Sequence, residues 1–315
     1  MNQIKIQNKF AVGADIGGSH ITCQLFDLEK NKPVEDSKTR LSVDSSDTKE
    51  KILEGWVTAI MKTLRKINLA NLAGIGFAMP GPFDYRNGIA WFEGVKKFES
   101  LYGVNIINEM RRRLHLSRES NIRFLNDAAC FAIGESWLGK AYKHEQILAL
   151  TLGTGFGSTF IQNKFPVKDK KGIPEDGFLY HVPFKNSVAD DYFSTRWFLK
   201  EYQQKTGMQV DGVKQLADDV NKNKIAAELF YKFGENLGTF LVPWIKNIGV
   251  TCVVLGGNIS KSYSLFQENL RNNLTKHGLK TDIYPTEIDE TAALFGSAKL
   301  CEDAYYQQLI AASII

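Results

Sequence analysis

The chain is poor in cysteine. Its 315 residues include four, at Cys23, Cys130, Cys252 and Cys301, and no two of them form a Cys-x-x-Cys pair. Disulfide-rich secreted domains and cysteine zinc sites both need closely spaced cysteines. The sequence therefore argues against a disulfide framework and against a cysteine zinc site, and it fits a reducing compartment.

Long apolar runs and a strong charge of either sign are also missing. No segment approaches the roughly 20 consecutive apolar residues of a membrane-spanning helix. The first ten residues, MNQIKIQNKF, lack the apolar core of a signal peptide. The net charge is only +4, whereas nucleic-acid-binding proteins usually carry a strongly basic patch. We therefore predict a soluble, cytoplasmic protein whose partner is neither a membrane nor a nucleic acid.

The chain does contain an internal repeat. Residues 11–27 (AVGADIGGSHITCQLFD) and residues 147–163 (ILALTLGTGFGSTFIQN) both read as an apolar strand, a glycine turn and a second strand. Asp15 of the first segment aligns with Thr151 of the second. The length suits two domains. The repeat therefore predicts two related half-domains that hold a nucleoside triphosphate between two glycine loops.

The two glycine turns are candidate phosphate loops. Glycine lets the backbone approach a phosphate closely, so that N–H groups can hold it. One such turn alone is more often an ordinary hairpin, but two in matching contexts favour a nucleotide site. The P-loop pattern GxxxxGK[ST] is absent. The candidate phosphate-binding residues are Gly17, Gly18 and Ser19 in the first turn, and Gly153, Thr154 and Gly155 in the second.

Asp15 distinguishes the first turn from the second. A carboxylate beside a phosphate repels it unless a cation lies between them. We therefore assign Asp15 to Mg²⁺, through water, because Mg²⁺ keeps several waters and takes few carboxylates. The alternative is that Asp15 only caps the turn.

Asp127 is the candidate catalytic base. It ends a predicted strand at 122–127, directly before a predicted helix. A helix N-terminus stabilises a carboxylate anion, and in kinases an aspartate takes the proton of the acceptor hydroxyl. Taken alone, an aspartate in this place is more often a helix N-cap. Its position between the two glycine loops, on the strand that begins the second half, favours the base.

Hydrophobic periodicity and turn residues predict the remaining elements. A polar loop is expected at 164–186, and the domain break near 115–122. Strands are expected at 9–17, 21–29, 72–79, 146–153, 158–165 and 251–258, and helices at 48–67, 104–115, 128–139, 187–205, 211–247, 259–275 and 291–309.

Five short motifs in one order resemble the ROK family of sugar kinases (repressor, open reading frame, kinase). The likeness runs from about residue 10 to residue 300, and the combination is specific although each motif is short. The motifs are Asp15-Ile-Gly-Gly-Ser, Met79-Pro-Gly-Pro-Phe-Asp84, Asn126-Asp127-Ala128-Ala129, Leu152-Gly-Thr-Gly-Phe-Gly157 and Leu255-Gly-Gly-Asn258.

The resemblance implies an α/β fold of the actin-like, ribonuclease-H-like type found in the hexokinase and Hsp70 superfamily. It implies ATP with Mg²⁺, a hexose or amino-hexose as the acceptor, and a homodimer. The domains would be 1–118, rejoined by a C-terminal helix at 298–315, and 119–297. By this likeness Asp127 matches the base, Asn126 and Gly81 match sugar contacts, and Gly257 matches the turn against adenosine.

The sequence departs from the family at three places. The usual zinc cluster of cysteines and histidine is absent, so no zinc site is expected. The sugar motif Glu-x-Gly-His is blurred to Glu175-Asp176-Gly177-Phe178. Glu175, His181 and Asp191 are therefore the candidates for sugar hydroxyls, with a solvated loop as the alternative. In 91–103 the family's sugar-binding asparagine has no counterpart, and Glu93 or a lysine is a candidate instead.

The leading hypothesis is a glucokinase-like, ATP-dependent kinase that phosphorylates a hexose or an amino-hexose at the C6 hydroxyl. A family repressor is disfavoured, because only eight residues precede Lys9 and a DNA-binding domain needs many more. A non-catalytic sugar sensor stays open as the alternative, given the altered sugar motif. Asp15, Asp127 and both glycine loops favour the enzyme.

Overall fold

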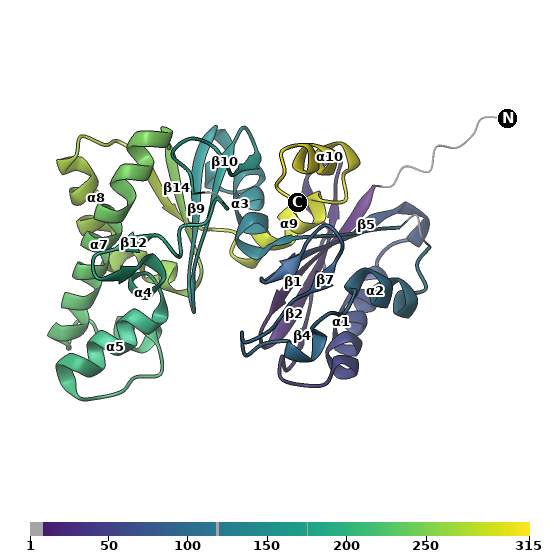
Figure 1. The fold of residues 1–315 in the computed structure, drawn as a ribbon, viewed down its shortest axis with the longest axis horizontal. Coiled ribbons are helices and arrows are strands. Elements are labelled where there is room, and N and C mark those ends of the chain that lie inside the picture. The colour runs from purple at the N-terminus through teal and green to yellow at the C-terminus, as the bar shows by residue number, and fades with distance from the viewer. Residues whose placement is uncertain (1–8, 118–119, 175) are drawn as a thin grey trace. The chain divides into compact units, whose positions relative to one another are not determined.

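A computed structural model describes residues 9–117, 120–174 and 176–315. The chain divides into two compact units, one of Met1–Gly134 with Glu290–Ile315 and one of Glu135–Asp289. Each unit is a mixed α/β body built on one sheet (Figure 1). Within the described residues, no helix is both long enough and apolar enough to cross a membrane.

The sheet of the first unit combines an antiparallel hairpin with parallel strands. Its order is β3-β2-β1-β5-β8, with β4 also paired to β2. β1 runs antiparallel to β2 and parallel to β5, and β5 runs parallel to β8. The strands are β1 (Phe10–Gly17), β2 (His20–Asp27), β3 (Lys32–Pro33), β4 (Thr39–Ser42), β5 (Leu72–Met79) and β8 (Asn121–Asn126). A separate small hairpin pairs β6 (Phe83–Asp84) with β7 (Ile89–Ala90).

Helices cover both faces of this first sheet (Figure 1). Alternate residues of a strand face opposite sides. Val12 and Ala14 of β1 join the core that contains Trp56 of α1 (Lys49–Leu64), whereas Gly13 lies against Leu294 of α9 (Glu290–Lys299). The other helices of this unit are α2 (Ile106–Leu114), α10 (Asp303–Ala311), and the 3-10 turns η1 (Leu69–Asn71) and η2 (Glu99–Leu101).

The sheet of the second unit repeats the same plan. Its order is β11-β10-β9-β14-β15, with β9 antiparallel to β10 and parallel to β14. β9 and β10 therefore correspond to β1 and β2, as the internal repeat predicts. The strands are β9 (Gln146–Leu152), β10 (Phe156–Gln162), β11 (Phe165–Val167), β14 (Cys252–Gly256) and β15 (Asp282–Pro285). β12 (Pro183–Phe184) and β13 (Ser187–Val188) form a separate hairpin.

An aromatic core holds the second unit together. The Phe193 ring, which follows α4, lies 6.0 Å from the Phe233 ring and 5.0 Å from the Phe240 ring of α7, measured between ring centroids. The helices are α4 (Ala189–Tyr192), α5 (Thr195–Thr206), α6 (Val213–Asp218), α7 (Lys224–Ile248) and α8 (Gln267–Lys276), with 3-10 segments η3 (Lys140–Lys143) and η4 (Asn258–Leu265). α3 (Asp127–Trp137) begins in the first unit and ends in the second.

Several expected elements differ from the observed ones. The expected helices at 187–205, 211–247, 259–275 and 291–309 are each two segments, because an apolar period continues across a short turn that it cannot reveal. The expected loop at 164–186 contains the short strands β11 and β12. The units divide at Gly134 and Glu290 rather than near residues 118 and 298, because β8 pairs with β5 and so belongs to the first sheet.

Candidate active site

The first glycine turn closes a tight hairpin. Gly17 pairs with His20 across β1 and β2, which leaves Gly18 and Ser19 as the two turn residues. Residues 43–45, which follow β4, form backbone hydrogen bonds to this turn. The N–H of Val43 donates to the carbonyl of Ser19 at 3.0 Å, and the N–H of Ser45 donates to the carbonyl of Gly18 at 3.2 Å. These two hydrogen bonds tie the carbonyl side of the turn to the segment after β4.

Asp15 and Asp127 lie at the same edge of the first sheet. Asp15 is level with Ala78 of β5, and Asn126 of β8 is level with the next residue, Met79. These three strands are parallel, so their carboxyl ends share one edge, where ligands bind in open α/β sheets. Asp127 follows directly as the first residue of α3. The expectation that its strand begins the second half is therefore wrong, and Asp127 shares a unit with Asp15.

The pKa values of both carboxyl groups are raised. Asp15 is half-buried. Desolvation first, and then the charges of Asp127 and Glu290, raise the pKa of Asp15 to about 7. Asp127 is open to solvent, yet the surrounding protein restricts its hydration and raises its pKa above the ordinary value, against the hydrogen bond from the Ala128 N–H. The site thus concentrates negative charge that a cation would relieve.

Asn126 performs the capping role that was the alternative explanation for Asp127. The Asn126 Oδ1 atom accepts from the N–H groups of Ala128 at 3.0 Å and Ala129 at 3.3 Å. Its Nδ2 group donates to the Tyr85 hydroxyl at 3.4 Å, and that hydroxyl donates to the Met79 carbonyl at 3.1 Å. Asp127 accepts one N–H, from Ala128 at 2.9 Å. The helix therefore has a cap without Asp127.

A charged cluster that the sequence analysis missed stands beside the first turn. Glu290, in the first turn of α9, bonds to Arg40 and lies 3.3 Å from the Lys38 Nζ atom and 3.5 Å from the His20 Nε2 atom. The other ring nitrogen of His20 is 3.2 Å from the Ser19 hydroxyl. Burial would raise the pKa of Glu290, but Lys38, Arg40 and His20 outweigh burial and lower it. No local signal links Glu290 to this turn, since 270 residues separate it from His20.

The residues at this edge fit a magnesium ion held through water. Carboxylate oxygens are hard ligands, and Mg²⁺ is usually held by one or two of them with several waters. Asp15, with Asp127 nearby, supplies such a set. Among the described residues, no group of three or more histidine, cysteine and carboxylate side chains could hold a metal ion by itself. The expected absence of zinc stays a prediction.

The second glycine turn is held by side-chain and backbone groups of the segment 190–196. The Phe156 N–H donates to the Asp190 Oδ1 atom at 2.7 Å, and Arg196 donates to the Thr154 carbonyl at 2.8 Å. Arg196 also pairs with Asp190. The Thr195 N–H donates to the Gly153 carbonyl at 2.7 Å. These contacts hold the turn formed by Gly153, Thr154 and Gly155 in place. The sequence analysis did not identify Asp190 or Arg196 as residues that support this turn.

Gly257 needs to be glycine for two reasons. Its φ of 82° lies in the left-handed region, and a Cβ atom would stand 2.4 Å from the Leu152 carbonyl oxygen. The structure therefore places the expected adenosine turn against the end of β9, one residue before Gly153.

The remaining candidate sugar contacts are divided between the two units. Glu175 lies outside the described residues. His181 is exposed and packs edge-on against Tyr180 at 4.9 Å. Asp191 is exposed and accepts from the Ser187 hydroxyl. Gly81 follows β5 in the first unit, where a Cβ atom would be 3.5 Å from the Tyr85 hydroxyl. The sugar roles of these residues stay predictions.

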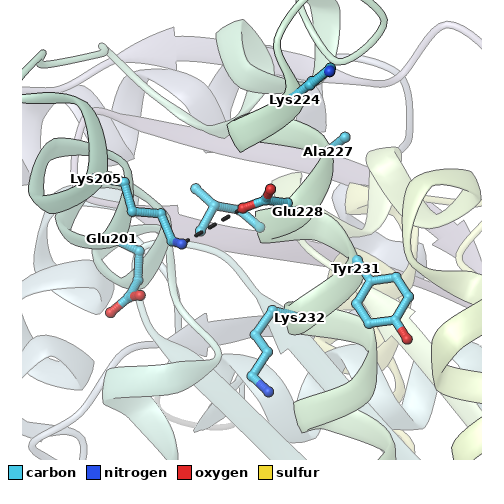
Figure 2. A pocket seen from close by; sticks show the side chains of 8 residues that line it. Glu201, Lys205, Lys224, Ala227, Glu228, Tyr231 and Lys232 are labelled. Carbon is cyan, nitrogen blue, oxygen red and sulfur yellow. Dashed lines mark ion pairs between the residues drawn. The ribbon is translucent and has the colours of Figure 1, made fainter.

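A surface pocket of about 650 Å³ in the second unit lies apart from these residues (Figure 2). It is open between α5 and α7, and Lys205 and Glu228 form an ion pair of 3.7 Å across it. Its lining is Glu201, Lys205, Lys224, Ala227, Glu228, Leu229, Tyr231 and Lys232. None of the expected site residues lines it, so it does not enter the candidate site.

Asp190 gives a direct test of the second turn. We expect Asp190→Ala to raise the KM for nucleotide by about tenfold, because it removes the acceptor for the Phe156 N–H and the partner of Arg196, a loss of about 1.5–3 kcal/mol. The adjacent Asp191→Ala should instead raise the KM for sugar. Steady-state kinetics with each substrate varied in turn would separate the two, and an unchanged nucleotide KM in Asp190→Ala would contradict the bracing role.

Comparison with known proteins gives matches along nearly the whole chain. A family model described as "ROK family" matches residues 11–304. An N-acetyl-D-glucosamine kinase from Photobacterium profundum is 25% identical over 291 residues, covering 87% of this chain and 91% of the relative. A glucokinase from Thermotoga maritima is 23% identical over 322 residues, covering 93% and 97%.

Solved structures match the fold. A ROK hexokinase from Thermus thermophilus gives a TM-score of 0.75 at 20% identity, covering 95% of this chain and 99% of its own. A ROK family glucokinase from Streptomyces griseus, in complex with glucose and AMPPNP, gives 0.72 at 17% identity, covering 93% and 99%. With the two repeated sheets, these matches confirm the predicted α/β fold of actin-like, ribonuclease-H-like type.

Proposed function

The chain belongs to the ROK family and is an ATP-dependent sugar kinase, and we propose that Asp127 is its general base. The acceptor is a hexose or an N-acetylated amino-hexose, phosphorylated at the C6 hydroxyl. The observation that carries this proposal is the shared sheet edge, where Asp15 and Asp127 lie beside a fixed glycine turn. The two named relatives, a glucokinase and an N-acetyl-D-glucosamine kinase, support both kinds of acceptor.

Each of these residues has a separate role in the proposed reaction. Asp127 accepts the proton of the sugar hydroxyl as that oxygen attacks the γ-phosphorus, while the bond from the γ-phosphorus to the β–γ bridging oxygen breaks and ADP leaves with its electron pair. The N–H groups of Gly18 and Ser19 would hold the phosphate, and the hydrogen bonds from Val43 and Ser45 already hold the turn that carries them, so little reorganisation is needed. Asp15 would hold Mg²⁺ through water, and the bound ion would neutralise phosphate charge. Thr154 and the glycines of the second turn hold the nucleotide.

The proposed function is tested by measuring which sugars the protein phosphorylates. The experiment is a coupled assay of ADP release with Mg·ATP over glucose, N-acetylglucosamine, N-acetylmannosamine, allose and fructose. Turnover of at least one sugar is the expected result, and phosphorus NMR of the product would locate the phosphate at C6. Absence of turnover with every sugar would overturn the proposed function. A homodimer and a cytoplasmic location stay predictions.

The dependence on Mg²⁺ should change with pH. Asp15 has a folded-state pKa of about 7 without metal, well above the ordinary value of about 3.9. The native state therefore binds an extra proton between these values, and metal-free stability falls as pH rises toward 7. Mg²⁺ competes with that proton. We expect Mg²⁺ with ADP to raise the melting temperature more at pH 8 than at pH 5.5.

The matched variant is Asp15→Asn, which removes the titrating group and keeps the shape. Differential scanning fluorimetry at both pH values would check the result. A Mg²⁺ stabilisation that is equal at the two pH values in the unchanged protein, or that persists in Asp15→Asn, would contradict the metal assignment.

A further inference from the structure

The side chain of Lys97 packs against the first glycine turn. A methyl group added at Gly18 would stand 3.1 Å from the Lys97 Cε atom and 3.5 Å from its Nζ atom. The Lys97 stem therefore covers the Cα atom of a residue whose N–H is expected to hold phosphate. Lys97 belongs to the segment 91–103, in which the sugar-binding asparagine expected from the family resemblance has no counterpart.

The backbone on both sides of Lys97 is fixed in an unusual conformation. Lys96 has φ 59° and Phe98 has φ 56°, a region that costs about 1–2 kcal/mol for residues other than glycine. Phe98 is fully buried, with its ring 5.6 Å from those of Trp56 and Phe92. Its N–H donates to the Ser45 carbonyl at 2.8 Å. Such conformations persist where the surrounding structure over-determines them, and they gather at functional sites.

The same segment is tied to the turn that Lys97 covers. Ser45, which accepts from Phe98, donates its own N–H to the Gly18 carbonyl at 3.2 Å. Ser100 donates to the Asp47 carbonyl at 2.8 Å. The segment and the turn are therefore held as one local assembly, and the place of Lys97 does not depend on a flexible loop.

The ammonium group of Lys97 has no ion-pair partner among the described residues. Among the described residues, no carboxylate lies within ion-pair distance of its ammonium group, whereas Lys38 and Arg40 on the other side of the turn both pair with Glu290. Lys97 also acts on the proposed base. Burial raises the pKa of Asp127, and Lys97 is among the groups that lower it.

We propose that Lys97 contacts the γ-phosphoryl group and stabilises its negative charge during transfer. The Lys97 side chain covers the Cα atom of Gly18 in the phosphate turn, and a cation at this turn lies beside the path that the transferred group is expected to take. Lysine binds phosphate as a compact point charge, and cations aimed at the developing charge lower the barrier to phosphoryl transfer. This proposal rests on the proposed function. It predicts an interaction with the γ-phosphate and none with ADP alone.

The test compares Lys97→Met with Lys96→Met, its neighbour. Both residues are exposed and on one loop, and both variants lose one positive charge and keep a similar stem. We expect Lys97→Met to lower kcat by about 10²-fold while the sugar KM changes less than about threefold. Lys96→Met should keep the activity of the unchanged protein. Lys97→Arg should recover part of the loss, because it restores the charge with a different shape.

Calorimetry with AMPPNP and with ADP, both with Mg²⁺, separates this proposal from the proposed function. Lys97→Met should bind AMPPNP about tenfold more weakly and ADP as tightly as the unchanged protein. Equal weakening for both nucleotides, or a kcat within twofold of normal, would overturn the role of Lys97. The two proposals can also fail separately. If the unchanged protein phosphorylated no sugar, but Lys97→Met still lost affinity for AMPPNP alone, the proposed function would be overturned. The contact between Lys97 and the γ-phosphate would then be supported.

Discussion

Replacing Asp127 with asparagine should lower kcat by about 10²–10⁴-fold, the range that general acid–base groups contribute. Asparagine keeps the size and the polar contacts of the side chain but cannot take a proton. The variant should stay folded, because Asn126 already caps α3 through Ala128 and Ala129. Single-turnover measurements, with nucleotide binding measured by calorimetry, would show a lost chemical step and a retained affinity.

Asp303→Asn is the matched control. Asp303 is also the first residue of a helix in the same unit, α10, and it pairs with Arg123 at 2.5 Å. The Asp303 side chain is 74% exposed, so the loss of its charge should cost about 1 kcal/mol of stability and leave turnover unchanged. If Asp127→Asn phosphorylated sugar at the normal rate, the base assignment would be wrong.

The dependence of kcat on pH is a second test of Asp127 as the base. The pKa of Asp127 is raised by desolvation, and a base must be unprotonated to accept a proton. The kcat of the unchanged protein should therefore fall as pH drops through that raised pKa. In Asp127→Asn, the residual rate should lose this acid limb.

Replacing Gly76 with alanine should destabilise the first unit by about 3 kcal/mol or more. A Cβ atom at Gly76 would stand 1.8 Å from the Ser297 carbonyl oxygen of α9. Gly13, its partner in the register of β1 and β5, would meet the Leu294 carbonyl oxygen at the same distance. These are backbone atoms of a helix, so the clash is relieved only if α9 moves away from the sheet.

Gly212→Ala is the control for this substitution. No atom lies within 4 Å of a Cβ built at Gly212, and its φ of 176° is open to any residue. It should change stability by less than about 1 kcal/mol. Urea denaturation of the full chain, followed by circular dichroism, would compare the two. A Gly76→Ala protein as stable as the unchanged one would contradict the close contact of α9 with β1 and β5.

Local patterns were sufficient to predict the elements that surround the candidate site. Alternating apolar residues and a glycine turn predicted the hairpins of β1 with β2 and of β9 with β10, because both signals act over a few residues. The strand before Asp127 was predicted for the same reason. The apolar period did not reveal where α9 ends and α10 begins, because the pattern continues across that turn.

The surroundings of Asp15 could not be predicted in this way. Sequence alone indicated a carboxylate at a phosphate turn and a second one before a helix. It placed the strand of Asp127 in the wrong half, because pairing between β5 and β8 joins segments separated by more than forty residues. It also missed Asp190 and Arg196, which brace the second turn from another segment.

By itself, the sequence determined the duplicated strand–turn–strand units, the two aspartates and the family to which the chain belongs. Those features depend on side-chain periodicity and on residues adjacent in the chain. Only the tertiary structure decided that α9 returns to β1 with Glu290 beside His20, and that Lys97 covers Gly18. The physical reason is that these contacts depend on how segments far apart in the chain pack together, and no local pattern records that packing.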